Sequence, residues 1–138
     1  MNEPLLQVTD LQKFFPVAGA GIFSRDKGTN KAVNGLSFTL HKGETLGLVG
    51  ESGCGKSTAG RTILKLYDPT AGSIKFEGEE ISGYSNSQMK PLRTKMQMIF
   101  QDPQSSLNPR QSVGAIIGAS FEVHKIKPEF GVKRAVQD

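Results

Sequence analysis

The chain has 138 residues, 36% of them hydrophobic and 22% charged, and its formal net charge is +4. This length allows at most one domain, no apolar run is long enough to cross a membrane, and the single cysteine excludes an internal disulfide. The first ten residues lack the basic leader and apolar segment of a signal peptide, so we expect a cytosolic protein.

The N-terminal part of the chain is predicted to be extended. Residues 5–8 predict a short strand, and Pro16 ends the regular pattern. Residues 17–30 are rich in glycine, alanine and polar side chains, which indicates a loop or a mobile hairpin. Residues 31–40 predict extended structure with a turn at Asn34–Gly35.

A glycine-rich loop follows between a predicted strand and a predicted helix. Residues 45–49 form a short apolar run typical of a strand, and residues 57–66 have helical spacing. Residues 50–58 follow the predicted strand and overlap the start of the predicted helix. They read Gly-Glu-Ser-Gly-Cys-Gly-Lys-Ser-Thr and match the phosphate-binding pattern G-x-x-x-x-G-K-[ST]. Strand, glycine loop and helix in this order are the context that the pattern requires. The alternative is a glycine-rich turn that matches by accident.

Each part of this loop has a reason in the chemistry of phosphate binding. Glycines allow backbone dihedrals that a Cβ forbids, so successive N–H groups can converge on an anion. The helix that begins near Gly55 adds further donors and the positive end of its dipole. We expect Lys56 to reach the β- and γ-phosphates of ATP, Ser57 to offer its hydroxyl to Mg²⁺ and Thr58 to hold the α-phosphate. The candidate site comprises Gly50, Glu51, Ser52, Gly53, Cys54, Gly55, Lys56, Ser57 and Thr58.

Cys54 stands at a position where the pattern tolerates any residue. One interpretation is a small filler. The other is a thiol whose reactivity is raised by the positive end of the helix. Under the second interpretation, alkylation of Cys54 blocks ATP binding and bound ATP protects the thiol.

The second half of the chain predicts further short elements. Residues 73–77 predict a strand, and residues 86–95 are weakly helical, with Pro91 near a helix start or a kink. Residues 96–100 predict a strand. Residues 112–126 have helical periodicity, and residues 129–138 start another helical pattern. A nucleotide-binding parallel sheet is buried on both faces, and residues 45–49 are the one strongly apolar strand, so the chain is short of the strands expected beside it.

Two segments carry a resemblance to a known family. Residues 31–64, KAVNGLSFTLHKGETLGLVGESGCGKSTAGRTIL, and residues 96–110, MQMIFQDPQSSLNPR, resemble the ATP-binding subunits of bacterial ABC transporters. The Ser-Leu-Asn-Pro-Arg segment at 106–110 and the glycine-rich insertion near 17–30 are typical of the oligopeptide/dipeptide importer branch. The resemblance implies an α/β fold: the P-loop NTPase core of an ABC-type ATPase, truncated, with an N-terminal antiparallel β portion and the start of the helical subdomain.

The resemblance also implies roles at matching positions. Gln101 resembles the Q-loop glutamine, which contacts Mg²⁺ or the attacking water and senses the membrane subunits, so Lys56 and Gln101 are the expected catalytic residues. Ser57 and Gln101 are the expected metal contacts. Phe15 resembles the aromatic residue that stacks on adenine, Phe14 competes for that role, and either could instead be core. Val33 is expected to line the adenine site.

Three motifs of the family do not occur in the 138 residues: the LSGGQ-type signature, the apolar Walker B strand ending in Asp-Glu and the switch histidine. Residues 81–85 loosely echo the signature but precede the Q-loop. We therefore expect residues 1–138 to form the N-terminal part of an ABC ATP-binding domain. Phosphoryl transfer needs several groups acting together, so we expect nucleotide contacts with negligible hydrolysis from this part alone.

The implied ligands are ATP and Mg²⁺. The implied partners are transmembrane permease subunits, a second ATP-binding subunit in a head-to-tail dimer and, indirectly, an extracytoplasmic solute-binding protein, at the cytoplasmic face of the inner membrane. We expect no nucleic-acid partner, because no basic stripe carries stacking aromatics. Two alternatives stay open: a truncated non-catalytic remnant of the subunit and a stand-alone P-loop small-molecule kinase. Peptide, nickel and other solutes all remain candidates for transport.

Overall fold

The structure is a computed structural model that describes residues 3–17, 28–102 and 107–137. The chain divides into two compact units, Met1–Lys90 and Pro91–Asp138. Most of the loop predicted at 17–30 and the first residue of the 106–110 segment lie outside the described residues.

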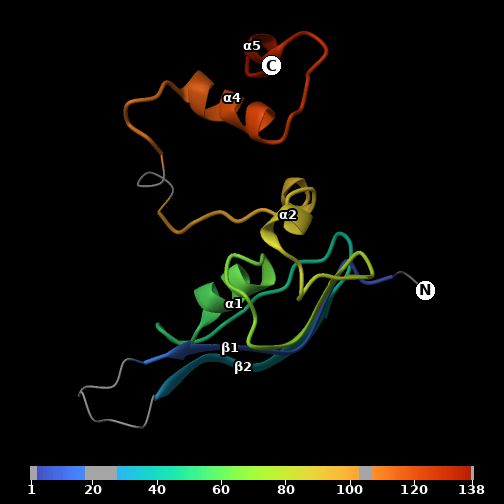
Figure 1. Cartoon of the computed structure of the whole chain (residues 1–138), viewed down its shortest axis with the longest axis vertical. Helices are drawn as coiled ribbons and strands as arrows, with labels where there is room; N and C mark the ends of the chain where they lie inside the picture. Colours follow the sequence, from blue (N-terminus) through green and yellow to red (C-terminus); the bar gives the residue numbers. More distant parts are fainter. Residues whose placement is uncertain (1–2, 18–27, 103–106, 138) are drawn as a thin grey trace. The chain divides into compact units, whose positions relative to one another are not determined.

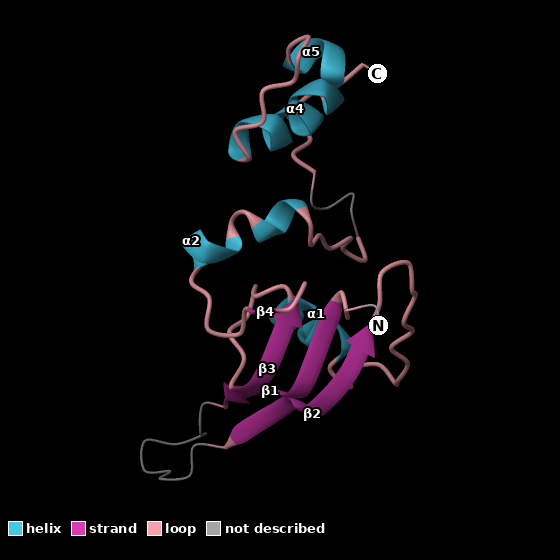
Figure 2. Ribbon diagram, turned by 90° about the vertical axis from the view of Figure 1, so that its right-hand side faces the viewer, coloured by secondary structure: helices cyan, strands magenta, loops and turns pink. Residues whose placement is uncertain are grey.

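The first unit is built on a four-stranded antiparallel sheet in the order β2-β1-β3-β4 (Figure 2). β1 spans Leu6–Pro16, β2 spans Thr29–Leu40, β3 spans Ala71–Phe76 and β4 spans Glu79–Glu80. β1 pairs with β2 from Leu6↔Leu40 to Pro16↔Thr29, and with β3 from Leu6↔Phe76 to Gln12↔Ala71. The predicted antiparallel N-terminal portion is confirmed, and β1 is longer than the strand expected at residues 5–8.

The turn predicted at Asn34–Gly35 is wrong, because β2 runs through these residues as one strand. Leu11 pairs with Leu36 and Gln12 pairs with Asn34, so Gly35 is an extra residue in the ladder. Gly35 has a φ of +81°, a conformation that glycine adopts at little energetic cost because it lacks a Cβ atom. The asparagine–glycine pair therefore marks a β-bulge.

Helix α1 (Lys56–Ile63) packs on one face of this sheet, against β1 and β2 (Figure 1). Ala59 and Thr62 are its buried residues. The helix ends where Lys65 takes a left-handed φ of +55° and the N–H of Leu66 donates to the carbonyl of Arg61 at 2.9 Å, a common way to close a helix. The apolar core of the unit consists of Val8, Leu11, Val33, Ala59, Ile74, Phe76, Ile81 and Met89.

The predicted helical segment at residues 86–95 is divided at Pro91. Helix α2 (Asn86–Met89) starts with a capping box, in which Ser85 and Gln88 each accept the other's backbone N–H. A 3₁₀ turn, η1 (Leu92–Thr94), follows Pro91 and belongs to the second unit. Proline lacks the N–H that a continuous helix would need there.

The strands predicted at residues 45–49 and 96–100 are wrong: neither segment is hydrogen-bonded as a strand in the part of the chain that the structure describes. The side chains of Leu46, Leu48 and Val49 are 47%, 46% and 93% exposed. A parallel strand is fixed by hydrogen bonds to its neighbours, and no described residues supply those neighbours.

The second unit contains two further helices. Helix α4 (Val113–Val123) starts at Ser112, whose hydroxyl accepts the N–H of Ala115 at 3.3 Å. Helix α5 (Val132–Ala135) packs against α4. Both lie within the predicted helical segments, in shorter form. Among the residues that the structure describes, no helix is long and apolar enough to span a membrane.

Candidate nucleotide-binding site

The backbone of the glycine loop takes conformations that suit glycine. Gly53 and Gly55 have φ values of +81° and +98°, in the left-handed region. At Gly50 the constraint is space, because a Cβ there would lie 2.5 Å from the Sγ atom of Cys54. These three glycines, two of the pattern and Gly53 between them, therefore allow the loop to fold back on itself before α1.

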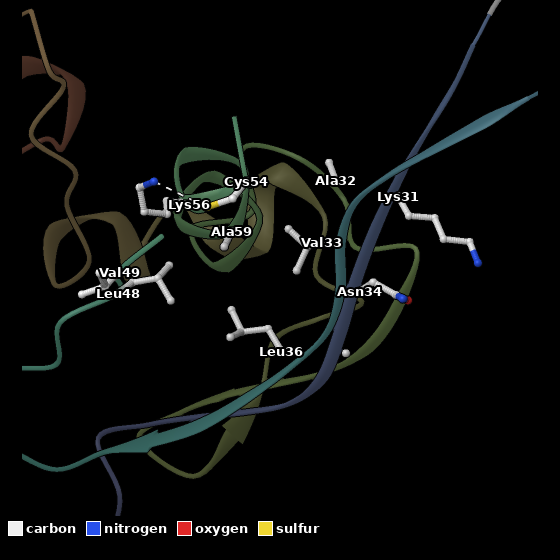
Figure 3. A pocket seen from close by; sticks show the side chains of 12 residues that line it. Lys31, Ala32, Val33, Asn34, Leu36, Leu48, Val49, Cys54, Lys56 and Ala59 are labelled. Carbon is white, nitrogen blue, oxygen red and sulfur yellow. Dashed lines mark hydrogen bonds between the residues drawn. The ribbon is translucent and has the colours of Figure 1, made fainter. Parts of the chain in front are cut away.

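The side chain of Lys56 folds back onto the loop that precedes it. Its Nζ atom donates to the carbonyl oxygens of Gly50 and Glu51, both at 2.6 Å. The same atom lies 3.4 Å from the Sγ atom of Cys54 (Figure 3). Lysine carries a compact charge on a flexible stem, which can be shared between backbone oxygens and phosphate oxygens. The predicted phosphate-contacting lysine thus lies beside the backbone of the loop.

The N-terminus of α1 is open to an anion. Its N-cap, Gly55, offers no side-chain hydrogen bond, and the first turn contains no acidic residue. The positive end of the helix dipole is therefore not compensated by its own side chains. Ser57 is exposed in this first turn and Thr58 is half-buried. The predicted metal and α-phosphate contacts are accordingly on the helix end that favours anions.

A pocket of about 410 Å³ joins the loop to β2. Such a volume falls in the range of small-molecule sites. Figure 3 shows Val33 and Leu36 pointing from β2 toward α1, the helix that carries Ala59. The pocket brings Val33, predicted to line the adenine site, together with Lys56. Its lining comprises Lys31, Ala32, Val33, Asn34, Gly35, Leu36, Leu48, Val49, Cys54, Gly55, Lys56 and Ala59.

The two candidate aromatic residues have different neighbours, and neither lines this pocket. The ring of Phe15 forms an edge contact with the ring of Tyr67, with centroids 5.5 Å apart and planes at 88°. The ring of Phe14 lies under the Nζ atom of Lys31, 5.6 Å from its centroid. Nothing in the sequence relates residue 67 to residue 15, so sequence reasoning missed Tyr67.

Gln101 lies in the second unit, whereas the glycine loop belongs to the first. Its side chain is exposed. The role of Gln101 therefore stays a prediction.

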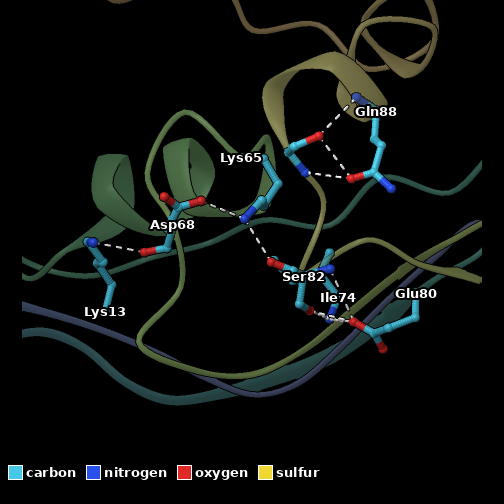
Figure 4. Close-up of polar contacts among 8 residues, drawn as sticks. Lys13, Lys65, Asp68, Ile74, Glu80, Ser82 and Gln88 are labelled. Atoms are coloured by element: carbon cyan, nitrogen blue, oxygen red, sulfur yellow. Dashed lines mark hydrogen bonds and ion pairs between the residues drawn. The ribbon is translucent and has the colours of Figure 1, made fainter.

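A polar cluster fixes the chain beyond α1 (Figure 4). The ammonium group of Lys65, whose side chain is 4% exposed, donates to the Oδ1 atom of Asp68 at 2.6 Å and to the carbonyl of Ser82 at 2.7 Å. The hydrogen bond from Lys65, and then its charge, hold the pKa of Asp68 below its usual value. These contacts offset the cost of the positive φ of Lys65.

Glu80 organises the neighbouring strands. Burial raises the pKa of Glu80, but hydrogen bonds from the hydroxyls of Ser73 and Ser82 and from the N–H groups of Ser82 and Ile74 outweigh it and lower the pKa overall. Among the described residues, no group of three His, Cys, Asp or Glu side chains could hold a metal ion.

A glycine loop that leads into a helix starting with Lys-Ser is the local arrangement of a P-loop nucleotide-binding protein, although residues 45–49 before it are not hydrogen-bonded as a strand in the described part of the chain. The sequence profile of the family described as ABC transporter matches residues 33–136. The chain belongs to the ABC transporter family, which implies that it binds a nucleotide.

Curated relatives agree with this assignment. The chain is 52% identical over 126 residues to the oligopeptide transport ATP-binding protein AppF of Bacillus subtilis, which covers 91% of this chain and 38% of AppF. It is 49% identical to OppF of the same organism, over 91% of this chain and 39% of OppF. The glutathione import ATP-binding protein GsiA of Salmonella typhimurium is 48% identical over 89% of this chain and 20% of GsiA. The chain thus spans less than two fifths of the length of these relatives.

Solved structures show the same fold. The ATP-binding cassette MJ0796, in a dimeric post-hydrolysis state bound to ADP and Pi, matches with a TM-score of 0.74 at 16% identity, over 96% of this chain and 54% of that one. CbiO1 from Clostridium perfringens, part of the ABC transporter complex cbiONQ, matches with a TM-score of 0.69 at 24% identity, over 99% of this chain and 49% of that one. The predicted ABC-type P-loop fold is confirmed.

Proposed function

We propose that the chain forms the ATP-binding part of the energy-coupling subunit of an ABC peptide importer. The observation that carries the proposal is the position of Lys56, whose ammonium group lies 2.6 Å from two carbonyls of a glycine loop at the start of a helix. The curated relatives are named as oligopeptide and glutathione transport proteins. These names favour transport over a stand-alone kinase.

In this proposal the first unit holds the phosphates of ATP. The N–H groups of residues 50–58 and the open end of α1 bind phosphate oxygens, and Lys56 contributes a mobile positive charge. Ser57, exposed in the first turn, offers its hydroxyl to Mg²⁺, which neutralises phosphate charge when it is bound. Phe15 stacks on adenine, Val33 borders the site, and Gln101 supplies an amide to Mg²⁺ or to water.

The whole protein is proposed to act with membrane partners. Transmembrane permease subunits receive the motion of a pair of ATP-binding subunits at the cytoplasmic face of the inner membrane, and a solute-binding protein delivers the peptide. The test is co-purification of the tagged chain with the permease subunits of a peptide importer. Recovery no greater than with a tagged unrelated protein would count against these partners.

The nucleotide part of the proposal is tested by calorimetry of Mg-ATP with the 138-residue chain. We expect a measurable heat of binding for the unaltered chain. Lys56→Ala should weaken the affinity for Mg-ATP about 10- to 100-fold, since hydrogen bonds to charged groups contribute about 1.5–3 kcal/mol. Lys42→Ala is the matched control, because Lys42 is an exposed lysine in the turn before the loop. Absence of binding by the unaltered chain, or equal affinity of the Lys56→Ala variant, would overturn the proposal.

A further inference from the structure

Two side chains, one from β1 and one from the segment after α1, contact the ring of Phe15. Tyr67 makes the edge contact, at 5.5 Å between centroids. The Nζ atom of Lys13 lies 5.0 Å from the centroid of Phe15 and 5.9 Å from that of Tyr67, and donates to the carbonyl of Asp68 at 2.8 Å. Arg61 lies 6.0 Å from the ring of Tyr67 and donates to its hydroxyl at 3.4 Å. Phe15 is therefore held by the segment that follows α1.

This arrangement connects Phe15 to the helix that carries the phosphate site. Lys56 and Ser57 stand in the first turn of α1, and Arg61 stands in its last turn. Five residues of α-helix rise about 7.5 Å, which is a fixed length because the helix is rigid. Through Arg61 and Tyr67, α1 sets where the ring of Phe15 lies with respect to the glycine loop.

An aromatic residue that stacks on a base must present a ring face in one orientation. An edge contact between aromatic rings stabilises that orientation beyond simple burial. Lys13 lies over one face of Phe15, so a base takes the opposite face. The ring of Phe14 lies against Lys31 of β2 instead.

We propose that Tyr67 is a positioning residue for adenine recognition, which orients the stacking ring of Phe15 without itself contacting the nucleotide. The inference rests on the proposed function, in which Phe15 stacks on adenine. It separates the two ends of the ligand: Tyr67 affects the base and leaves the phosphate site unchanged.

The test compares Mg-ATP with Mg-tripolyphosphate, a probe that has phosphates but no base. Tyr67→Leu should weaken Mg-ATP binding about two- to tenfold, the range of an aromatic pair contact, and should leave Mg-tripolyphosphate binding unchanged. Tyr67→Phe keeps the ring and should restore the affinity for Mg-ATP. In a Phe15→Leu background, Tyr67→Leu should cause no further loss.

Two outcomes would overturn the inference while leaving the proposed function intact. One is an equal loss of affinity for Mg-ATP and for Mg-tripolyphosphate in Tyr67→Leu, which indicates a purely structural role. The other is a loss that is additive with Phe15→Leu, which indicates that Tyr67 does not act through Phe15. If the unaltered chain binds neither ligand, the proposed function itself fails and the inference with it.

A second measurement avoids any change at Tyr67. The chain has two tyrosines and no tryptophan, so Tyr84→Phe leaves Tyr67 as the single fluorescent tyrosine. Saturating Mg-ATP should change this fluorescence, Mg-tripolyphosphate should not, and Phe15→Leu should abolish the change. An unchanged signal with saturating Mg-ATP would overturn the proposal even if Tyr67→Leu does not fold.

Discussion

A Cβ atom placed on Gly55 would lie 2.0 Å from the carbonyl oxygen of Ala32 on β2. The last glycine of the phosphate loop is thus pressed against the backbone of the sheet. Because backbone atoms cannot swing aside as a flexible side chain can, no other residue fits between the loop and β2 without moving one of them. This contact positions the start of α1.

Gly55→Ala should therefore lower both stability and affinity for Mg-ATP. It adds the steric clash with Ala32 to the strain of an L-residue at φ +98°. We expect a loss of at least about 2 kcal/mol in the free energy of unfolding, measured by denaturant titration.

Gly43→Ala is the matched control for Gly55→Ala. Gly43 has a φ of +81°, but among the described residues, its two chain neighbours aside, no atom lies within 4 Å of a Cβ built there. It isolates the backbone strain, so the loss should be about 1 kcal/mol and Mg-ATP affinity should be unchanged. Equal losses in the two variants would show that the contact with Ala32 is not decisive.

Alkylation of Cys54 should block ATP binding. The thiol is exposed, and its Sγ atom lies 3.4 Å from the Nζ atom of Lys56. An added acetamide group would occupy the space around the ammonium group that phosphate requires. We expect iodoacetamide labelling, followed by mass spectrometry, to slow when Mg-ATP is present. Cys54 is the single cysteine, so the signal reports one site. Equal labelling rates with and without nucleotide would favour the interpretation of Cys54 as a filler.

Asp68→Asn should destabilise the first unit at neutral pH but not at a pH well below 3.8, where the carboxylate is protonated. The folded-state pKa of Asp68 lies below its ordinary value of 3.8, so its stabilising contribution is present above that value and is lost as pH falls through the folded pKa. The side chain of Asp68 is 86% exposed, so solvent screening keeps the effect below about 1 kcal/mol. Thermal melts at pH 7 should differ between the two proteins and should converge as pH drops well below 3.8. A difference that persists at low pH would contradict the charge argument.

Glu80→Gln should weaken the pairing of β3 with β4. The carboxylate of Glu80 accepts hydrogen bonds from Ser73, Ser82 and the N–H of Ile74. In glutamine an NH₂ group, which is itself a donor, replaces one of the two acceptor oxygens, so some of these hydrogen bonds are lost. We expect a loss of about 1 kcal/mol at pH 7 by denaturant titration.

The pH dependence gives the control for Glu80. Because its folded-state pKa is lowered from 4.5, the difference should be full above that value and should vanish as pH falls through the folded pKa. Glu3→Gln, at an exposed glutamate near the N-terminus, should leave stability unchanged at all pH values. A pH-independent loss in Glu80→Gln would indicate altered packing instead.

Much of this molecule could be predicted from local sequence. The phosphate loop and α1 follow from glycine spacing and helical periodicity, which act over a few residues. The strands at residues 45–49 and 96–100 could not be predicted correctly, because an apolar run shows the capacity for a strand while hydrogen bonding to a neighbour decides it. Asn34–Gly35 was ambiguous for the same reason, since a positive φ serves a turn or a bulge depending on the partner strand.

By itself the sequence determined the kind of ligand and the family, because a phosphate loop is a local arrangement of glycines, one lysine and a helix start. Only the tertiary structure decided which side chains act on that loop from a distance. Ala32 limits Gly55 to a hydrogen side chain, and Tyr67 meets Phe15, because strand pairing and the packing of α1 bring together residues that chain spacing does not relate.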